Sequence, residues 1–284
     1  MAKRKREENE PPSNESQAET AEATNDKPSQ DANPTFEIPI QGKKPLHCSR
    51  HGPSTAKPSL IFTHGAGGDL KAPAMQDFAH GFSETDTLVM FKGNMNLKAR
   101  VASFGRVVEH EGCRPALGGR SMGARAACLA AMEDGAEVEA LVLVSFPLVG
   151  KQKADSREKV LLDLPEGVDV LFISGDNDSM CDLDHLRDVM ARMKGRTWLA
   201  EVVGADHGTA LRDKEGSQPV RRSTGEVAAE WLRGREEGKR WMSLVWDEEE
   251  GVVVSSGWRE ERPRGADDGG EAEGDDGEGT EGGG

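Results

Sequence analysis

The chain has 284 residues and a formal net charge of −15, yet residues 36–246 carry only −1 of it, because the acidic residues gather in residues 1–35 and 247–284. This body is long enough for one α/β domain, and its near-neutral charge and lack of Tyr argue against direct nucleic-acid binding. No apolar run approaches the roughly 20 residues that span a bilayer, no secretory signal follows the basic N-terminus, and the four cysteines form no Cys-x-x-Cys pair. These features exclude a membrane partner, a zinc motif and a disulfide framework, and indicate an intracellular protein.

Residues 1–35 have no large apolar side chain beyond Met1, so we expect them to be disordered. The run Lys3, Arg4, Lys5, Arg6 fits a nuclear-localisation pattern, and the alternative is a solvated basic start. The sequence therefore leaves the nucleus and the cytoplasm open as locations.

In residues 36–246, short apolar runs alternate with segments of helical periodicity. Residues 36–50 are expected to supply one or two edge strands. Further strands are predicted at 59–63, 87–91, 114–118, 138–145, 168–174 and 198–203, and helices at 69–82, 99–111, 122–133, 182–193 and 224–233. This alternation predicts an α/β fold with a mostly parallel sheet and helices on both faces.

A glycine-rich loop, formed by His64, Gly65, Ala66, Gly67 and Gly68, follows the strand at 59–63. A phosphate-binding loop is disfavoured, because Leu70 stands where a third glycine is required and no Gly-Lys-Ser/Thr follows. No cofactor motif is found. We expect His64 to brace this loop rather than to react.

Ser121 lies in a Gly-x-Ser-x-Gly pattern between Gly119 and Gly123, after an apolar strand and before an alanine-rich helix. In that context the pattern is typical of a nucleophile elbow, where the glycines let strand and helix approach closely and the hydroxyl stands exposed. Serine needs a base to take its proton. Tight packing without catalysis is the alternative interpretation.

An acid and a histidine follow in the chain order Ser, Asp, His. Asp178 comes just after the strand at 168–174 and is predicted to orient the histidine, with Asp176 as the alternative. His207, in a glycine-flanked loop after the strand at 198–203, is predicted to be the general base. A calcium loop over 176–185 is rejected, since Met180 and Cys181 stand where an oxygen ligand and Gly are needed.

Acyl transfer requires two N–H donors that face the developing oxyanion. The residue after the nucleophile, Met122, and the glycine-rich loop, through Ala66, are expected to supply them. Only about twenty residues separate Val149 from Val168, where lids of this fold usually lie, so an open site without a large lid is expected.

Residues 240–246, 251–254 and Trp258 are unusually apolar for a region between a core and a tail. We expect them to pack on the domain as an extra strand or helix, with a docking segment for a partner as the alternative. Residues 247–284 are interpreted as an acidic, glycine-rich disordered tail that aids solubility or contacts basic proteins.

Residues 62–68, 118–123, 143–148 and 172–175, with Asp178, Met180 and Cys181, and then residues 205–207, together carry a resemblance. Over residues 36–235 the chain resembles the α/β-hydrolase-like family that groups testis-expressed protein 30 with the third subunit of the non-specific lethal acetyltransferase complex, a branch near the dienelactone hydrolases. The resemblance implies an α/β-hydrolase fold and places Ser121, Asp178 and His207 in the nucleophile, acid and base positions. The expected function is a serine hydrolase of small esters or thioesters, and the alternative is a hydrolase-fold interaction subunit of a nuclear complex without turnover.

Overall fold

The structure, a computed structural model, describes residues 34–53, 55–150 and 157–260. The predictions for the extreme ends, including the basic run at residues 3–6 and the acidic residues after 260, lie outside the described residues.

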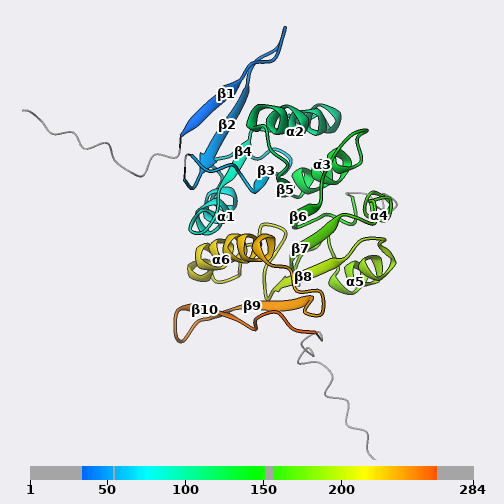
Figure 1. Cartoon of the computed structure of the whole chain (residues 1–284). Coiled ribbons are helices and arrows are strands. Elements are labelled where there is room, and N and C mark those ends of the chain that lie inside the picture. Colours follow the sequence, from blue (N-terminus) through cyan, green and yellow to red (C-terminus); the bar gives the residue numbers. More distant parts are fainter. Residues whose placement is uncertain (1–33, 54, 151–156, 261–284) are drawn as a thin grey trace, which may run out of the picture. The chain divides into compact units, whose positions relative to one another are not determined.

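The described residues form a ten-stranded sheet whose strand order is β1-β2-β4-β3-β5-β6-β7-β8-β9-β10 (Figure 1). All neighbouring strands from β4 to β9 run parallel, whereas β1, β2 and β10 each pair antiparallel with their neighbours. The mostly parallel sheet predicted from the sequence is therefore confirmed. The strands are β1 Thr35–Ile38, β2 Leu46–His51, β3 Leu60–Thr63, β4 Leu88–Phe91, β5 Ala116–Arg120, β6 Ala140–Val144, β7 Asp169–Gly175, β8 Thr197–Val202, β9 Trp241–Asp247 and β10 Val252–Ser255.

The central strands are short apolar runs in which every residue is buried, as in β3, β4 and β6. A parallel strand covered by helices on both faces has no solvent side, so its sequence need not alternate. Two apolar cores result, one on each face of the sheet.

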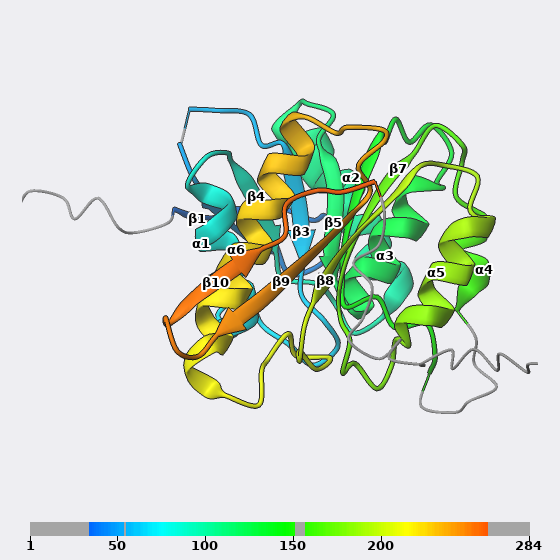
Figure 2. The ribbon, with the colours of Figure 1, turned by 90° about the horizontal axis from the view of Figure 1, so that it is seen from below.

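Helices α1 and α6 cover one face of the sheet, and α2, α3, α4 and α5 cover the other (Figure 2). Their bounds are α1 Pro73–Ser83, α2 Leu97–Glu111, α3 Met122–Ala131, α4 Glu158–Leu162, α5 Leu183–Arg192 and α6 Lys214–Arg233. Within the part of the chain that the structure describes, no helix is long and apolar enough to cross a bilayer.

Two helices begin four or more residues away from the predicted start. Asp69 does not start α1: its Oδ1 accepts from the Lys71 N–H at 3.0 Å and its Oδ2 pairs with Lys92, and the helix begins at Pro73. Helix α6 begins about ten residues before the predicted start, with Asp213 as its N-cap. Its first turns contain Gly216 and Pro219, which disfavour a helix locally, but tertiary packing stabilises them.

Both ends of the sheet extend beyond its parallel centre. At one end β1 and β2 form the edge hairpin expected from residues 36–50. At the other end β9 and β10 form a hairpin, so the prediction that the apolar segment after residue 240 packs on the domain is confirmed. The domain boundary predicted at residue 246 is wrong, because β10 continues the sheet and Val253 and Trp258 pack against the core. Strand β10 is only four residues long and lies in an otherwise acidic segment, which is why the predicted boundary stood before it although its valines were expected to pack.

Candidate active site

The loops that follow β3, β4, β5, β6, β7 and β8 meet at one edge of the sheet, because parallel strands place their carboxyl ends together. The residues predicted from the sequence to carry chemistry lie in these loops or, for Met122, at the first position of the helix that follows. The site can therefore be assembled strand by strand.

Ser121 forms a sharp turn between β5 and α3. Its backbone has φ 53° and ψ −113°, in the positive-φ region that non-glycine residues seldom adopt. A Cβ at Gly119 would lie 2.4 Å from the Gly123 carbonyl carbon, and one at Gly123 would lie 2.3 Å from the Thr63 carbonyl oxygen. Only glycine fits at both positions, so the pattern around Ser121 reflects a close strand-to-helix approach.

Ser121, His207 and Asp178 form one chain of hydrogen bonds. The Ser121 Oγ lies 2.9 Å from His207 Nε2, and His207 Nδ1 lies 2.8 Å and 3.0 Å from the two carboxylate oxygens of Asp178. A carboxylate accepts only, so Nδ1 carries the proton and donates it to Asp178. Nε2 is then the acceptor for the Ser121 hydroxyl, which is the arrangement a general base requires.

The two acids near the end of β7 have different contacts. The Asp178 side chain is fully buried, whereas a quarter of the His207 side chain is exposed. Asp178 Oδ1 also accepts from the Met180 N–H at 2.8 Å, which fixes the carboxylate. Asp176 lies away from the histidine and accepts from the Gly204 N–H at 2.6 Å. Of the two alternatives left open by the sequence, the structure brings Asp178 to His207.

The loop that carries His207 is held from two sides. Its own Asp206 Oδ1 accepts from the N–H groups of Gly208 at 2.6 Å and Ala210 at 3.0 Å. The guanidinium of Arg120, the residue before Ser121, donates to the His207 carbonyl. Burial lowers the pKa of Arg120, and Asp178 and Asp206 partly oppose that effect.

Thr209 and Ser145 make a second contact, next to His207. Besides Ser121, they are the non-glycine residues with positive φ in the described part of the chain, at 51° and 47°. Both are buried, and their hydroxyls lie 3.3 Å apart. Because Ser145 follows β6 and Thr209 follows His207, this contact ties the base loop to the centre of the sheet.

The glycine-rich loop lies against Ser121. A Cβ at Gly65 would be 3.4 Å from the Ser121 Cβ, so the loop backbone faces the serine at van der Waals distance. Gly67 has a φ of +65°, and its N–H contacts the Met95 sulfur at 3.0 Å. Gly68 approaches the His64 ring closely. The loop therefore depends on glycine where it turns and where it meets other groups.

His64 makes hydrogen bonds at both of its ring nitrogens. Its Nδ1 lies 2.7 Å from the Gly65 carbonyl and its Nε2 accepts from the Gly93 N–H at 3.1 Å. These partners require a proton on Nδ1 and none on Nε2, so the ring is neutral. Burial is the main cause that lowers the pKa of His64, and a lowered pKa agrees with a neutral ring.

Arg100 is a site residue that the sequence analysis missed. It is fully buried and donates to the backbone carbonyls of His64, Gly65, Gly93 and Asn94. No carboxylate among the described residues pairs with it, and burial lowers its pKa to about 10. The sequence pattern that could have indicated its burial is the helical spacing, because Arg100 lies four and seven residues before the buried Phe104 and Val107 of α2.

The two predicted oxyanion donors occupy suitable elements. Met122 is the first residue of α3, where a helix leaves its N–H groups without intrahelical acceptors and its dipole favours negative charge. Ala66 lies exposed in the loop between Gly65 and Gly67. No large lid is evident among the described residues between β6 and β7, which contain only the five-residue helix α4.

Comparison with known proteins is consistent with this geometry. Residues 94–232 match the family model described as an alpha/beta hydrolase domain. Among solved structures, Est1E from Butyrivibrio proteoclasticus has 15% identity and a TM-score of 0.56, with 72% of this chain and 100% of that chain covered.

Two further structures are similar. The alpha-beta serine hydrolase homologue from Coxiella burnetii has 18% identity and a TM-score of 0.53, over 69% of this chain and 97% of that one. XC6422 from Xanthomonas campestris, described as a serine hydrolase without lid, has 18% identity and a TM-score of 0.50, over 72% and 96%. The chain has the α/β-hydrolase fold, and its residues 94–232 match a family model of alpha/beta hydrolase domains.

Proposed function

We propose that this protein is a serine hydrolase that cleaves carboxylic esters or thioesters, with Ser121 as nucleophile, His207 as base and Asp178 as orienting acid. The observation that carries the proposal is the continuous hydrogen-bonded chain from the Ser121 Oγ through His207 to Asp178. The fold alone does not require it, since packing places no demand on these three side chains to meet.

In the first half of the reaction, the Ser121 Oγ attacks the carbonyl carbon while its proton moves to His207 Nε2. The Asp178 carboxylate stabilises the imidazolium that forms. The N–H groups of Met122 and Ala66 donate to the oxyanion. The tetrahedral intermediate then expels the alcohol or thiol, which takes the proton from Nε2.

In the second half, a water molecule gives a proton to His207 and attacks the acyl-enzyme. The same donors stabilise the second oxyanion, and collapse returns the proton to the Ser121 Oγ. The short connection between β6 and β7 favours an accessible site, and small acyl groups are the substrates proposed.

A fluorophosphonate probe tests the proposal. It forms a covalent bond only with an activated serine, so wild type is expected to be labelled and Ser121→Ala to be unlabelled. Ser83→Ala is the matched control, because Ser83 lies on α1 and bonds only a local carbonyl. Folded wild-type protein that resists the probe contradicts the proposal. Acyl p-nitrophenyl esters of graded length then define the acyl preference.

The finer relationship, to the family of testis-expressed protein 30 and the third non-specific lethal subunit, is also proposed, on the motifs around Ser121 and Asp178. The alternative function, an interaction subunit without turnover, rests on the charged ends, which lie mostly outside the described residues. The two functions separate in the labelling experiment, because a subunit without turnover does not require a reactive Ser121.

A further inference from the structure

A groove of about 860 Å³ runs between α2 and the turn that joins β1 to β2. One end is formed by the loop after β4, at residues 92–94, and the other by the β-hairpin turn. We call it the basic groove. Its lining includes Lys43, Lys44, His47, Lys92, Asn94, Asn96, Lys98, Ser103 and Arg106.

Most of the positive charge that lines the basic groove is not paired. No Asp or Glu lines it. Lys43, Lys44, Lys98 and Arg106 have no ion-pair partner within the described residues, whereas other cations on this domain are paired, such as Arg187, Arg221 and Arg222. The groove also contains the N-terminal end of α2, whose dipole adds positive potential.

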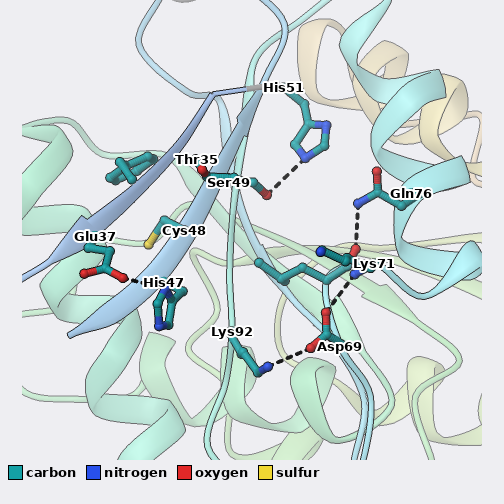
Figure 3. A pocket seen from close by; sticks show the side chains of 12 residues that line it. Thr35, Glu37, His47, Cys48, Ser49, His51, Asp69, Lys71, Gln76 and Lys92 are labelled. Carbon is teal, nitrogen blue, oxygen red and sulfur yellow. Dashed lines mark hydrogen bonds and ion pairs between the residues drawn. The ribbon is translucent and has the colours of Figure 1, made fainter. Parts of the chain in front are cut away.

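A second hollow on the other side of His47 and Lys92 provides a comparison (Figure 3). It has a similar volume, about 770 Å³, but its charges are balanced. Glu37 pairs with His47 at 2.8 Å, and Asp69 pairs with Lys92 at 2.7 Å. Thus two adjacent hollows differ in charge, and only the basic groove suits a multiply charged anion.

One end of the basic groove lies beside the glycine-rich loop of the proposed active site. Strands β5, β3 and β4 are neighbours, so the loops that follow them lie side by side at the same sheet edge. The Gly93 N–H, in the wall of the groove, donates to His64 in the glycine-rich loop. Two strand spacings, about 10 Å, separate the end of β4 from the end of β5. A single small molecule spans that distance.

We propose that the basic groove binds phosphate groups on the leaving group of the substrate. The substrate class is then an ester or thioester whose alcohol or thiol part carries phosphates, while its acyl carbonyl lies at Ser121. This inference rests on the proposed hydrolase function. Four unpaired cations exceed what one carboxylate requires, and the volume accommodates a nucleotide-sized group. Asn94 and Asn96 add amide groups at the end near the nucleophile.

Two thioesters with the same acyl group test the inference on the full chain. Butyryl-coenzyme A carries phosphates, and S-butyryl-N-acetylcysteamine carries none. In wild type at low salt, kcat/KM is expected to be about tenfold or more higher for the phosphorylated substrate, and the difference should shrink at high salt. Equal kcat/KM values for the two substrates in wild type overturn the inference.

A matched pair of variants assigns the effect to the basic groove. Lys44→Gln with Lys98→Gln removes two exposed groove charges, and Lys194→Gln with Arg233→Gln removes two exposed charges elsewhere. The first variant is expected to lose most of the preference for the phosphorylated substrate and to retain its rate with the neutral one. The second should behave as wild type. Equal losses in both variants overturn the inference, since they indicate a net-charge effect.

Binding and labelling separate this inference from the proposed function. Coenzyme A and inorganic pyrophosphate are titrated calorimetrically into Ser121→Ala, where no turnover interferes. Binding that weakens in the variant with both Lys44 and Lys98 replaced supports the basic groove even if Ser121 resists the fluorophosphonate. If neither coenzyme A nor pyrophosphate binds to Ser121→Ala while the fluorophosphonate still labels the wild-type protein, the inference is overturned and the hydrolase proposal stands.

Discussion

The Asp178 carboxylate is buried, and its main hydrogen-bond partner is the imidazole of His207. The buried carboxylate accepts from His207 Nδ1 and from the Met180 N–H. Asp178→Asn keeps the shape of the side chain but offers an amide, which favours the wrong imidazole tautomer. We expect kcat with a p-nitrophenyl ester to fall by about 10⁴-fold while KM changes little.

Asp176→Asn is the control for this substitution. Asp176 lies two residues away, and its Oδ1 accepts from the Gly204 N–H without contact to the histidine. An asparagine oxygen can accept the same hydrogen bond, so the variant should retain activity within a few-fold. A comparable loss of kcat in the two variants contradicts the assignment of Asp178.

Arg100 stabilises the glycine-rich loop by donating hydrogen bonds to backbone carbonyl groups that are shielded from solvent. Arg100→Met fills similar space but leaves those carbonyls without a donor. We expect the free energy of unfolding to decrease by about 2–4 kcal/mol, measured by urea denaturation. Lys98→Met, on the exposed side of the same helix, should change it by less than about 0.5 kcal/mol. If Arg100→Met is as stable as the control, these hydrogen bonds do not hold the loop.

At the residue scale, sequence spacing predicted that Ser121, His207 and the pair Asp176 and Asp178 lie at one sheet edge, because each follows an apolar strand and a parallel sheet gathers strand ends, but it did not decide between the two acids. It was insufficient for Arg100 and Arg120. Their acceptors are backbone carbonyls from other loops, and such partners leave no pattern in the side chains.

Elements beside the site are joined by the hydroxyl contact between Ser145, after β6, and Thr209, after His207. Thr209→Val preserves the size and β-branching of the side chain but leaves the buried Ser145 hydroxyl without this partner. The expected cost is about 1–2 kcal/mol of unfolding free energy. Since the contact also fixes the base loop, the rate of fluorophosphonate labelling should fall, whereas binding of a neutral substrate should not.

Thr209→Ser is the matched control, because it retains the hydroxyl. It should keep most of the labelling rate and of the stability. If Thr209→Ser and Thr209→Val lose labelling to the same extent, the methyl group rather than the hydroxyl contact matters, and the interpretation of the pair is wrong.

At the element scale, the strands were predicted well because buried parallel strands are continuous apolar runs, as in β6 and β7. Helix starts were predicted less well. The first turns of α6 form because Trp246 packs against Gly216 and its indole N–H donates to Asp213 at 2.9 Å, contacts between residues about thirty positions apart. No local pattern contains that information.

For the whole domain, buried neutral histidines connect folding to pH. His51 is 2% exposed at the end of β2, with its Nε2 3.1 Å from the Ser49 hydroxyl. Burial, with a smaller effect of His80, lowers its pKa from 6.5 to about 4. Between these two values the unfolded chain binds a proton that the native domain does not, so stability falls as pH falls from 6.5 toward 4.

The expected size follows from that pKa difference, at about 1.4 kcal/mol per unit, and amounts to about 3 kcal/mol by pH 4. His64, whose pKa burial also lowers, contributes in the same direction. Urea denaturation over this pH range measures the slope. His51→Gln cannot take up the proton and should flatten the slope, while His47→Gln, at a side chain that is 60% exposed, should leave it nearly unchanged. A slope that persists in His51→Gln shows that other groups, and not this buried imidazole, set the acid sensitivity of the fold.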